Sequence, residues 1–189
     1  MCMIRDNYVG QLVVANPNNP KDDGLSRSVH MIVTHTPTLA VSLQINQPYQ
    51  DLTLSRVTRN IGIDHQGEQP IYVGGNINQH KIHVIHSLDW SGVGTVSLTE
   101  QIGLTNDISV LMAVSRGEGP EYFRACAGYW TWDDGRFERE LLGLVPIEDD
   151  PYRWECLEAT IETVFLVDPG MQWHHCIEEL ARQKVSAWL

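Results

Sequence analysis

The chain has 189 residues, of which 42% are hydrophobic and 20% charged, as in an ordinary globular protein, and this length suits a single domain spanning residues 1–189. Thirteen Lys and Arg against 24 Asp and Glu give a net charge of -11, which opposes direct binding to nucleic-acid phosphates. The sequence has neither a signal peptide nor an apolar run of roughly 18 residues, so we expect a cytoplasmic protein that does not cross a membrane.

Apolar patterning in the first third predicts strands. They are expected at residues 12–15, 29–33 and 39–45. Residues 35–38 have the length of a hairpin turn between the second and third strands. In the third strand apolar and small or polar positions alternate, which predicts one buried face carrying Leu39, Val41, Leu43 and Ile45.

The middle of the chain mixes both periods. A helix is expected from Asp51, as its N-cap, to Gly62. Another helix is expected from Thr105, also as an N-cap, with Ile108, Leu111, Met112 and Ser115 on one face. Between them we expect strands at residues 69–73 and 81–87, the second paired with residues 95–98.

The last third continues the α+β pattern. Residues 122–132 read as an apolar and aromatic strand, followed by a turn and a short helix that ends at Leu142. A last strand is expected at residues 154–159. A final helix begins after Pro169-Gly170, and its apolar stripe consists of Trp173, Cys176, Ile177, Leu180 and Ala181.

Basic residues occur as two short pairs and form no larger cluster. Arg56 and Arg59 form one pair; Arg136 and Arg139 form the other, which alternates with Glu138 and Glu140. We interpret both as solvated helix faces with local ion pairs.

An ordered set of motifs covers nearly the whole chain. It comprises residues 10–17 ending in Asn16-Pro17, then Asn46-Gln47-Pro48, Tyr72-Val73-Gly74-Gly75, His86, Gly119-Pro120, Gly128-Tyr129-Trp130-Thr131-Trp132 and the run from Gly135 to Leu141. This order resembles the YqgE/AlgH family. The chain departs from the family pattern where Asn76, rather than Pro, follows the Gly-Gly pair.

The resemblance implies an α+β fold of coiled, bifurcated β-sheets with helices packed on the outside. Members of the family are often described as transcriptional regulators. The resemblance brings no defined catalytic residues, so no active site is carried over.

Histidine patterns offer no metal site. His80, His83 and His86 lie on a predicted strand, where the first and last are about 20 Å apart and the middle one faces the other way. His174 and His175 adjoin Cys176 on a predicted helix, where neighbouring side chains diverge by about 100°. We therefore expect neither a metal nor another cofactor.

Four cysteines are present: Cys2, Cys126, Cys156 and Cys176. None forms a C-x-x-C pair. Cys126 is a redox or catalytic candidate because Arg124, two residues away on the same face of a strand, can lower the pKa of its thiol. The competing interpretation is an inert structural cysteine.

Glycines and prolines at strand ends form the other candidate site. Glycine allows positive φ and close backbone approach, so such loops can gather into a ligand surface, or they can simply shape a coiled sheet. The candidates for that surface are Asn46, Pro48, Gly74, Gly75, His86, Gly119, Pro120 and Gly128.

Three functional hypotheses remain. The first is a non-enzymatic protein that binds a protein partner or a small ligand, with an indirect regulatory role. The second is a regulator that binds DNA directly, which the charge of -11 opposes. The third is an enzyme or thiol-based redox sensor that uses Cys126.

Overall fold

The computed structural model describes residues 7–20, 24–144, 146 and 152–187. Its strands are β1 Gln11–Ala15, β2 Val29–Thr36, β3 Leu39–Gln44, β4 Pro48–Thr53, β5 Pro70–Val73, β6 Ile77–Ser87, β7 Val96–Ser97, β8 Ile102–Thr105, β9 Phe123–Asp133 and β10 Trp154–Glu158. Its helices are α1 Leu54–Asn60, α2 Ser109–Ser115, α3 Arg136–Leu142, the π-helical turn η1 Glu162–Leu166 and α4 Pro169–Ser186.

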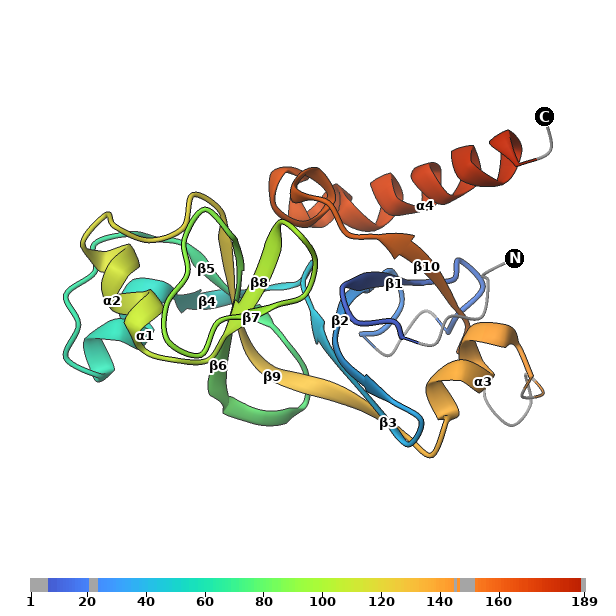
Figure 1. Ribbon diagram of the computed structural model, residues 1–189, viewed down its shortest axis with the longest axis horizontal. Helices are drawn as coiled ribbons and strands as arrows, with labels where there is room; N and C mark the ends of the chain where they lie inside the picture. Colours follow the sequence, from blue (N-terminus) through green and yellow to red (C-terminus); the bar gives the residue numbers. More distant parts are fainter. Residues whose placement is uncertain (1–6, 21–23, 145, 147–151, 188–189) are drawn as a thin grey trace.

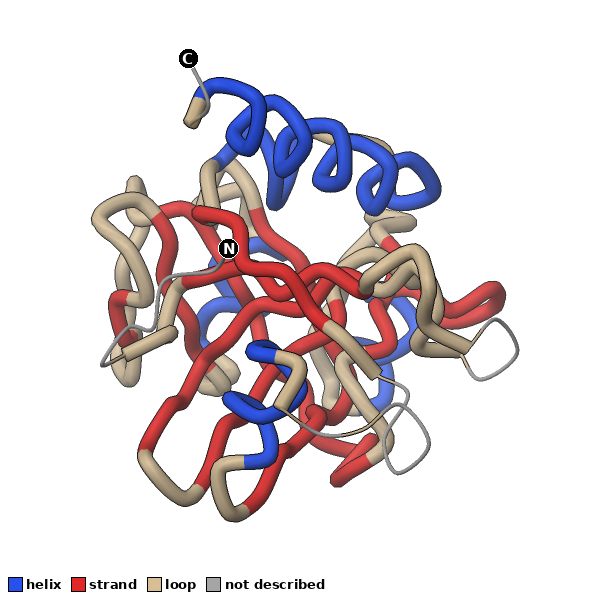
Figure 2. Tube along the Cα trace, turned by 90° about the vertical axis from the view of Figure 1, so that its right-hand side faces the viewer, coloured by secondary structure: helices blue, strands red, loops and turns tan. Residues whose placement is uncertain are grey.

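The helices lie on the outside of a strongly curled sheet (Figure 1). α1 and α2 cover one end of the molecule, α3 lies near the opposite end, and α4 runs along one side. The strands cross in the middle of the molecule when it is viewed from its end (Figure 2). The expected α+β fold is confirmed. In the described part of the chain no helix has the length and apolarity that a membrane crossing requires.

β9 is the strand on which the sheet is organised. The strand order is β10-β1-β2-β3-β9-β6-β8-β7, with β4 and β5 as a side branch. Residues 125–127 of β9 pair in parallel with β5 and antiparallel with β6. Residues 130–133 pair with β3 instead. The neighbour of β9 therefore changes from β5 to β3 at Gly128, and this change divides the sheet into two branches.

Three glycines make that branch point possible. A Cβ atom on Gly74 would lie 2.2 Å from the Gly128 carbonyl oxygen, and one on Gly75 would lie 2.1 Å from the Tyr129 carbonyl oxygen. Gly128 has φ = 74°. Only glycine combines this close approach with a left-handed backbone at low cost.

Each branch has its own hydrophobic core. The larger core lies under β1, β2, β3 and β10 and receives Trp173, Cys176 and Leu180 from α4. The smaller one gathers Leu54 of α1 and Val110 of α2 against β5, β6 and β9.

A buried arginine fastens the C-terminal elements to the sheet. Arg124 of β9 is 3% exposed. Its Nη1 donates to the Ile45 carbonyl and to Gln172 Oε1, each at 2.6 Å, and its Nη2 donates to the Val167 carbonyl at 3.2 Å. The guanidinium also lies 4.9 Å from the centre of the Tyr72 ring. One side chain therefore joins β9, the end of β3, η1 and α4.

Replacing Arg124 with Leu should lower the free energy of unfolding by about 3 kcal/mol or more, because two buried acceptors and one partly buried acceptor lose their donor. Urea denaturation measures this loss. The matched control is Arg116→Leu, because Arg116 is exposed and ends α2. Equal stabilities of the two variants would contradict the anchoring role of Arg124.

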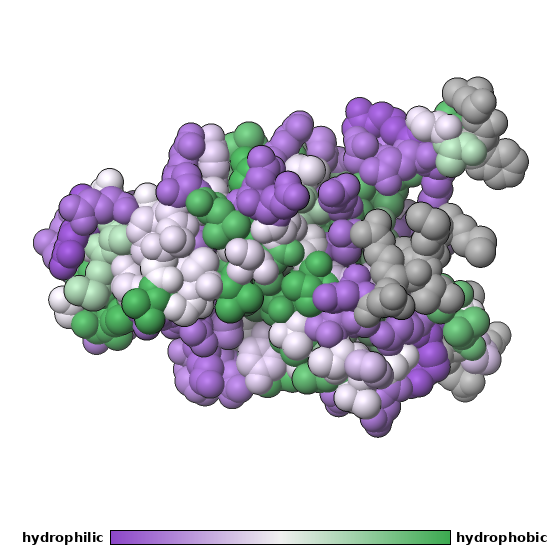
Figure 3. Space-filling model, in the orientation of Figure 1, coloured by the Kyte–Doolittle hydropathy of each residue, from purple (hydrophilic) through white to green (hydrophobic). Residues whose placement is uncertain are grey.

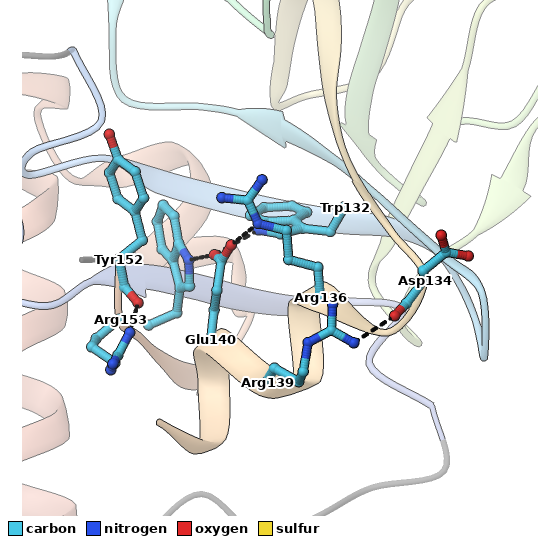
Figure 4. A network of polar contacts seen from close by, with 8 residues as sticks. Trp132, Asp134, Arg136, Arg139, Glu140, Tyr152 and Arg153 are labelled. Carbon is cyan, nitrogen blue, oxygen red and sulfur yellow. Dashed lines mark hydrogen bonds and ion pairs between the residues drawn. The ribbon is translucent and has the colours of Figure 1, made fainter. Parts of the chain in front are cut away.

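A buried carboxylate in α3 replaces part of the expected solvated face. Glu140 is 2% exposed, and its Oε2 accepts from the indole nitrogens of Trp132 at 2.9 Å and Trp154 at 2.7 Å. Its Oε1 accepts from Arg136 Nε at 2.6 Å. Figure 4 shows the Glu140 carboxylate pointing toward Arg136 and Trp132. The interpretation of α3 as a solvated face is therefore wrong for Glu140.

Beside Glu140 lies a buried, neutral histidine. The ring of His30 is enclosed by Trp130, Trp132 and Trp154. Its nitrogens lie 3.0 Å from the hydroxyls of Ser42 and Ser28. Burial lowers the pKa of His30 from 6.5 to about 3.

Acid should therefore destabilise the protein through His30. Below its ordinary pKa of 6.5 the unfolded chain takes up a proton that the folded chain does not, so stability falls as the pH falls from 6.5 towards 3. The loss at pH 5 is about 2 kcal/mol. Urea denaturation at pH 7 and pH 5 should show a smaller difference for His30→Gln than for wild type. His80→Gln, at an exposed site, should match wild type.

Several expected element boundaries are wrong. Asp51 lies in β4, and Thr53 precedes α1 as its N-cap. Thr105 ends β8, and the N-cap of α2 is Ile108. β6 pairs with β8 and β9, whereas β7 pairs with β8.

Two expected apolar faces also differ from the structure. In α2 the residues buried are Val110 and Leu111, whereas Ile108 is 47% and Met112 37% exposed. In α4 Gln172 is buried while Ala181 is exposed. The polar Gln172 is buried because it accepts from Arg124 and donates to the Thr163 carbonyl.

Candidate functional site

The two branches of the sheet enclose a cleft of about 380 Å³, which we call the apolar cleft. One wall comes from the β2–β3 hairpin, the other from β6, β7 and β8, and β9 forms the floor. It is lined by Val33, Thr34, Leu39, Val41, Leu43, His83, Gly94, Val96, Leu104, Thr105, Asn106, Tyr129 and Thr131. Figure 3 shows apolar side chains gathered at the centre of this face, between β7 and the β2–β3 hairpin.

β3 supplies most of the hairpin wall, and the burial of its first half is the reverse of what the sequence predicts, whereas Leu43 and Ile45 are fully buried as expected. Ala40, Ser42 and Gln44 are at most 2% exposed. Leu39 and Val41, on the other side of the strand, are only partly buried. The small and polar side therefore faces the protein interior, where Ser42 meets His30. The apolar side faces the cleft, so the expectation that Leu39 and Val41 are core residues is wrong.

His83 is the histidine that lines the cleft. Its Nε2 is buried and has no hydrogen-bond partner among the described residues. Its ring lies edge-on to that of Tyr129, with centroids 5.9 Å apart. Burial, with a smaller effect of Lys81, lowers the pKa of His83. The neutral imidazole therefore carries, beside the cleft, one buried nitrogen without a hydrogen bond among the described residues.

Cleft volume and composition fit a small-molecule site. Ligand pockets are concave, mostly apolar and roughly 300–1,000 Å³, with a few convergent polar groups. The apolar cleft has this volume, and its polar groups are His83, Thr105, Asn106 and Tyr129. Its residues come from segments far apart in the sequence, and their one shared sequence signal is the alternation in β3.

Comparison with known proteins decides the family. The model of the AlgH-like family matches residues 12–184. The chain belongs to the AlgH-like family. The resemblance found in its motifs is thereby confirmed.

Curated relatives of this AlgH-like chain match it over most of their length. The UPF0301 protein of Sphingopyxis alaskensis is 26% identical over 174 residues, which cover 91% of this chain and 88% of the relative. A UPF0301 protein of Cereibacter sphaeroides strain ATCC 17029 is 30% identical over 168 residues, which cover 87% and 86% of the two chains.

Solved structures share the AlgH-like fold. The solution structure of the AlgH protein from Pseudomonas aeruginosa matches with a TM-score of 0.73 and 25% identity, covering 95% of this chain and 93% of that one. A crystal structure from Corynebacterium diphtheriae matches with a TM-score of 0.71 at 18% identity, covering 94% and 90%, and shows the fold alone.

The structure divides the eight residues of the expected ligand surface between two places. Five of them, Asn46, Pro48, Gly74, Gly75 and Gly128, lie around the branch point, where Gly74 accepts from Gln44 and donates to Ala127. The other three, His86, Gly119 and Pro120, lie near the start of β9.

Most of these residues have structural partners in the AlgH-like chain. Asn46 accepts from the Val29 amide and donates to the Arg27 carbonyl. His86 is fully buried, with Nδ1 2.9 Å from the Ser87 carbonyl oxygen, and Pro120 is buried. Pro48 is exposed in β4. Their role as a ligand surface stays a prediction, and the geometry favours a role in shaping the sheet.

The three histidines of β6 do not converge on one site. His80 is exposed, whereas His83 faces the apolar cleft and His86 is buried. Within the described residues no three His, Cys, Asp or Glu side chains are grouped to hold a metal ion.

Cys126 has surroundings that oppose reactivity. It is fully buried beside Arg124, and burial raises the pKa of its thiol to about 12, although Arg124 acts in the opposite direction. Cys176 is also buried, with a pKa raised to about 12, and Cys156 is half-buried. Cys2 lies outside the described residues. The sensor hypothesis stays a prediction with little physical support.

Alkylation rates test the role of Cys126. In the native protein at pH 8, iodoacetamide should modify Cys126 at least about 100-fold more slowly than Cys156, because a buried thiol with a raised pKa supplies little thiolate. Peptide mass spectrometry measures both rates, and in urea they should converge. Cys176 is the internal control for burial. A native Cys126 that reacts faster than Cys156 would restore the sensor hypothesis.

Proposed function

We propose that this AlgH-like chain is a non-catalytic, single-domain cytoplasmic protein that binds a small ligand in the apolar cleft. The observation that supports it most strongly is the inverted burial of the first half of β3. Ser42 and Gln44 are buried, while Leu39 and Val41 face an open cleft.

Leaving an apolar strand face open costs stability. Each aliphatic side chain gains about 1.5–3 kcal/mol when it is moved from water into an apolar environment. A ligand that covers Leu39, Val41 and Val33 would recover part of that free energy, and this is what an apolar binding site offers.

The cleft carries few of the groups that a reaction would use: its hydroxyls belong to Thr and Tyr, and Nε2 of its histidine, His83, has no hydrogen-bond partner among the described residues. Nucleophilic and acid–base catalysis needs a nucleophile or carboxylate within reach of a base. Among the described residues that line the cleft there is no Asp, Glu, Cys, Lys or Arg. This composition favours binding over catalysis.

The same geometry is compatible with an indirect regulatory role. The ligand would lie between the two branches, and its presence would be transmitted to a protein partner through their outer surfaces. Direct DNA binding has less support, because the chain carries a net charge of -11.

Filling the cleft should abolish ligand binding. Val41→Trp places an indole in the cleft, whereas Val93→Trp adds the same ring at a position that is 78% exposed. Native mass spectrometry of gently purified protein should show a bound small molecule in wild type and Val93→Trp. The bound fraction should be at least about tenfold lower in Val41→Trp.

Thermal melting of both variants controls for misfolding. A bare mass in wild type, with no small molecule in an organic extract of the protein, would contradict ligand binding and favour a protein partner. An equally occupied Val41→Trp variant would place the ligand elsewhere.

A further inference from the structure

The two walls of the apolar cleft differ in chemistry. The β2–β3 wall presents Val33, Leu39, Val41 and Leu43, with Thr34 at an exposed position. The opposite wall adds Leu104 and Val96 but also carries His83, Thr105 and Asn106. A ligand held between these walls has an apolar body and a polar group on one side.

No side chain in the described lining of either wall is suited to pair with a full charge; Lys81, which lowers the pKa of His83, is exposed and lies outside that lining. The described lining contains no Asp, Glu, Lys or Arg, and the lowered pKa of His83 keeps its imidazole neutral near pH 7. A carboxylate or ammonium group buried here would lose its hydration without gaining an ion pair, which costs several kcal/mol. The polar group of the ligand is therefore uncharged.

The position of that polar group follows from His83. Its Nε2 is buried and lacks a partner within the described residues, which costs about 1–3 kcal/mol in a folded protein. The contact of the His83 ring with Tyr129 holds it in place. A hydroxyl or amide group suits either tautomer of a neutral imidazole, because each both donates and accepts hydrogen bonds.

We propose that the ligand is a small uncharged amphipathic molecule, with an alcohol or amide group hydrogen-bonded to the His83 imidazole and an aliphatic body against Val33, Leu39 and Val41. This inference rests on the proposed function of the cleft. It adds the chemical class of the ligand and the residue that selects it.

Three probes of equal length test the class: hexanol, hexanoate and hexylamine. Each is titrated at pH 7.5 into the full-length, isotope-labelled protein, and binding is read from the methyl resonances of Val33 and Val41. Hexanol should bind with a Kd at least about tenfold lower than that of either charged probe, because only the neutral head avoids an uncompensated charge.

Variants at His83 test the contact. His83→Phe keeps an aromatic ring and removes the nitrogens, so it should raise the Kd of hexanol about fivefold to tenfold. His83→Gln keeps a hydrogen-bonding group and should recover part of the affinity. His80→Phe makes the same change at an exposed position three residues earlier in β6 and should leave the Kd unchanged.

The outcomes separate the inference from the proposed function. If all three probes shift Val33 and Val41 with similar affinity, if hexanoate binds best, or if His83→Phe changes nothing, the uncharged class is wrong while the cleft remains a binding site. If no probe shifts these resonances at saturation, the small-ligand function fails and the inference fails with it.

Discussion

No side chain fits where β5 and β9 separate, and the rest of the architecture depends on that constraint. Gly74, Gly75 and Gly128 let two backbones approach more closely than any Cβ allows. β9 can then exchange one neighbour for another in a single residue. Without this exchange, β3 and β5 would compete for one edge of β9, and the sheet would not enclose a cleft.

Arg124, near the start of β9, has a role complementary to that of the glycines. The glycines allow the two branches to separate, and Arg124 holds the end of β3 and the C-terminal helices to the strand they share. Among the described residues, Arg124 donates hydrogen bonds to carbonyl and amide oxygens, and its guanidinium also lies over the Tyr72 ring. Burying a charge in this way is costly unless its hydrogen bonds are well placed, which makes the joint between the branches specific.

The sequence predicts most strands correctly because alternation is a local property, visible in β2, β3, β6 and β9. It misses β4, where Pro48 and Asp51 interrupt any alternation. The alternation in β3 also does not predict which face of the strand is buried in the interior. That choice depends on His30 and the surrounding tryptophans, which lie far away in the sequence. The sequence shows His83 as part of a histidine pattern, but its place in a cleft depends on β2, β3 and β8.

The alternation of β9 also places two different chemical environments on adjacent residues. Tyr129 lines the apolar cleft, whereas Trp130 lies beside His30 in the tryptophan cluster. The Trp130 indole nitrogen is buried and has no hydrogen-bond partner among the described residues. The protein thus carries an intrinsic fluorophore, one of its six tryptophans, one peptide bond from a residue that lines the cleft.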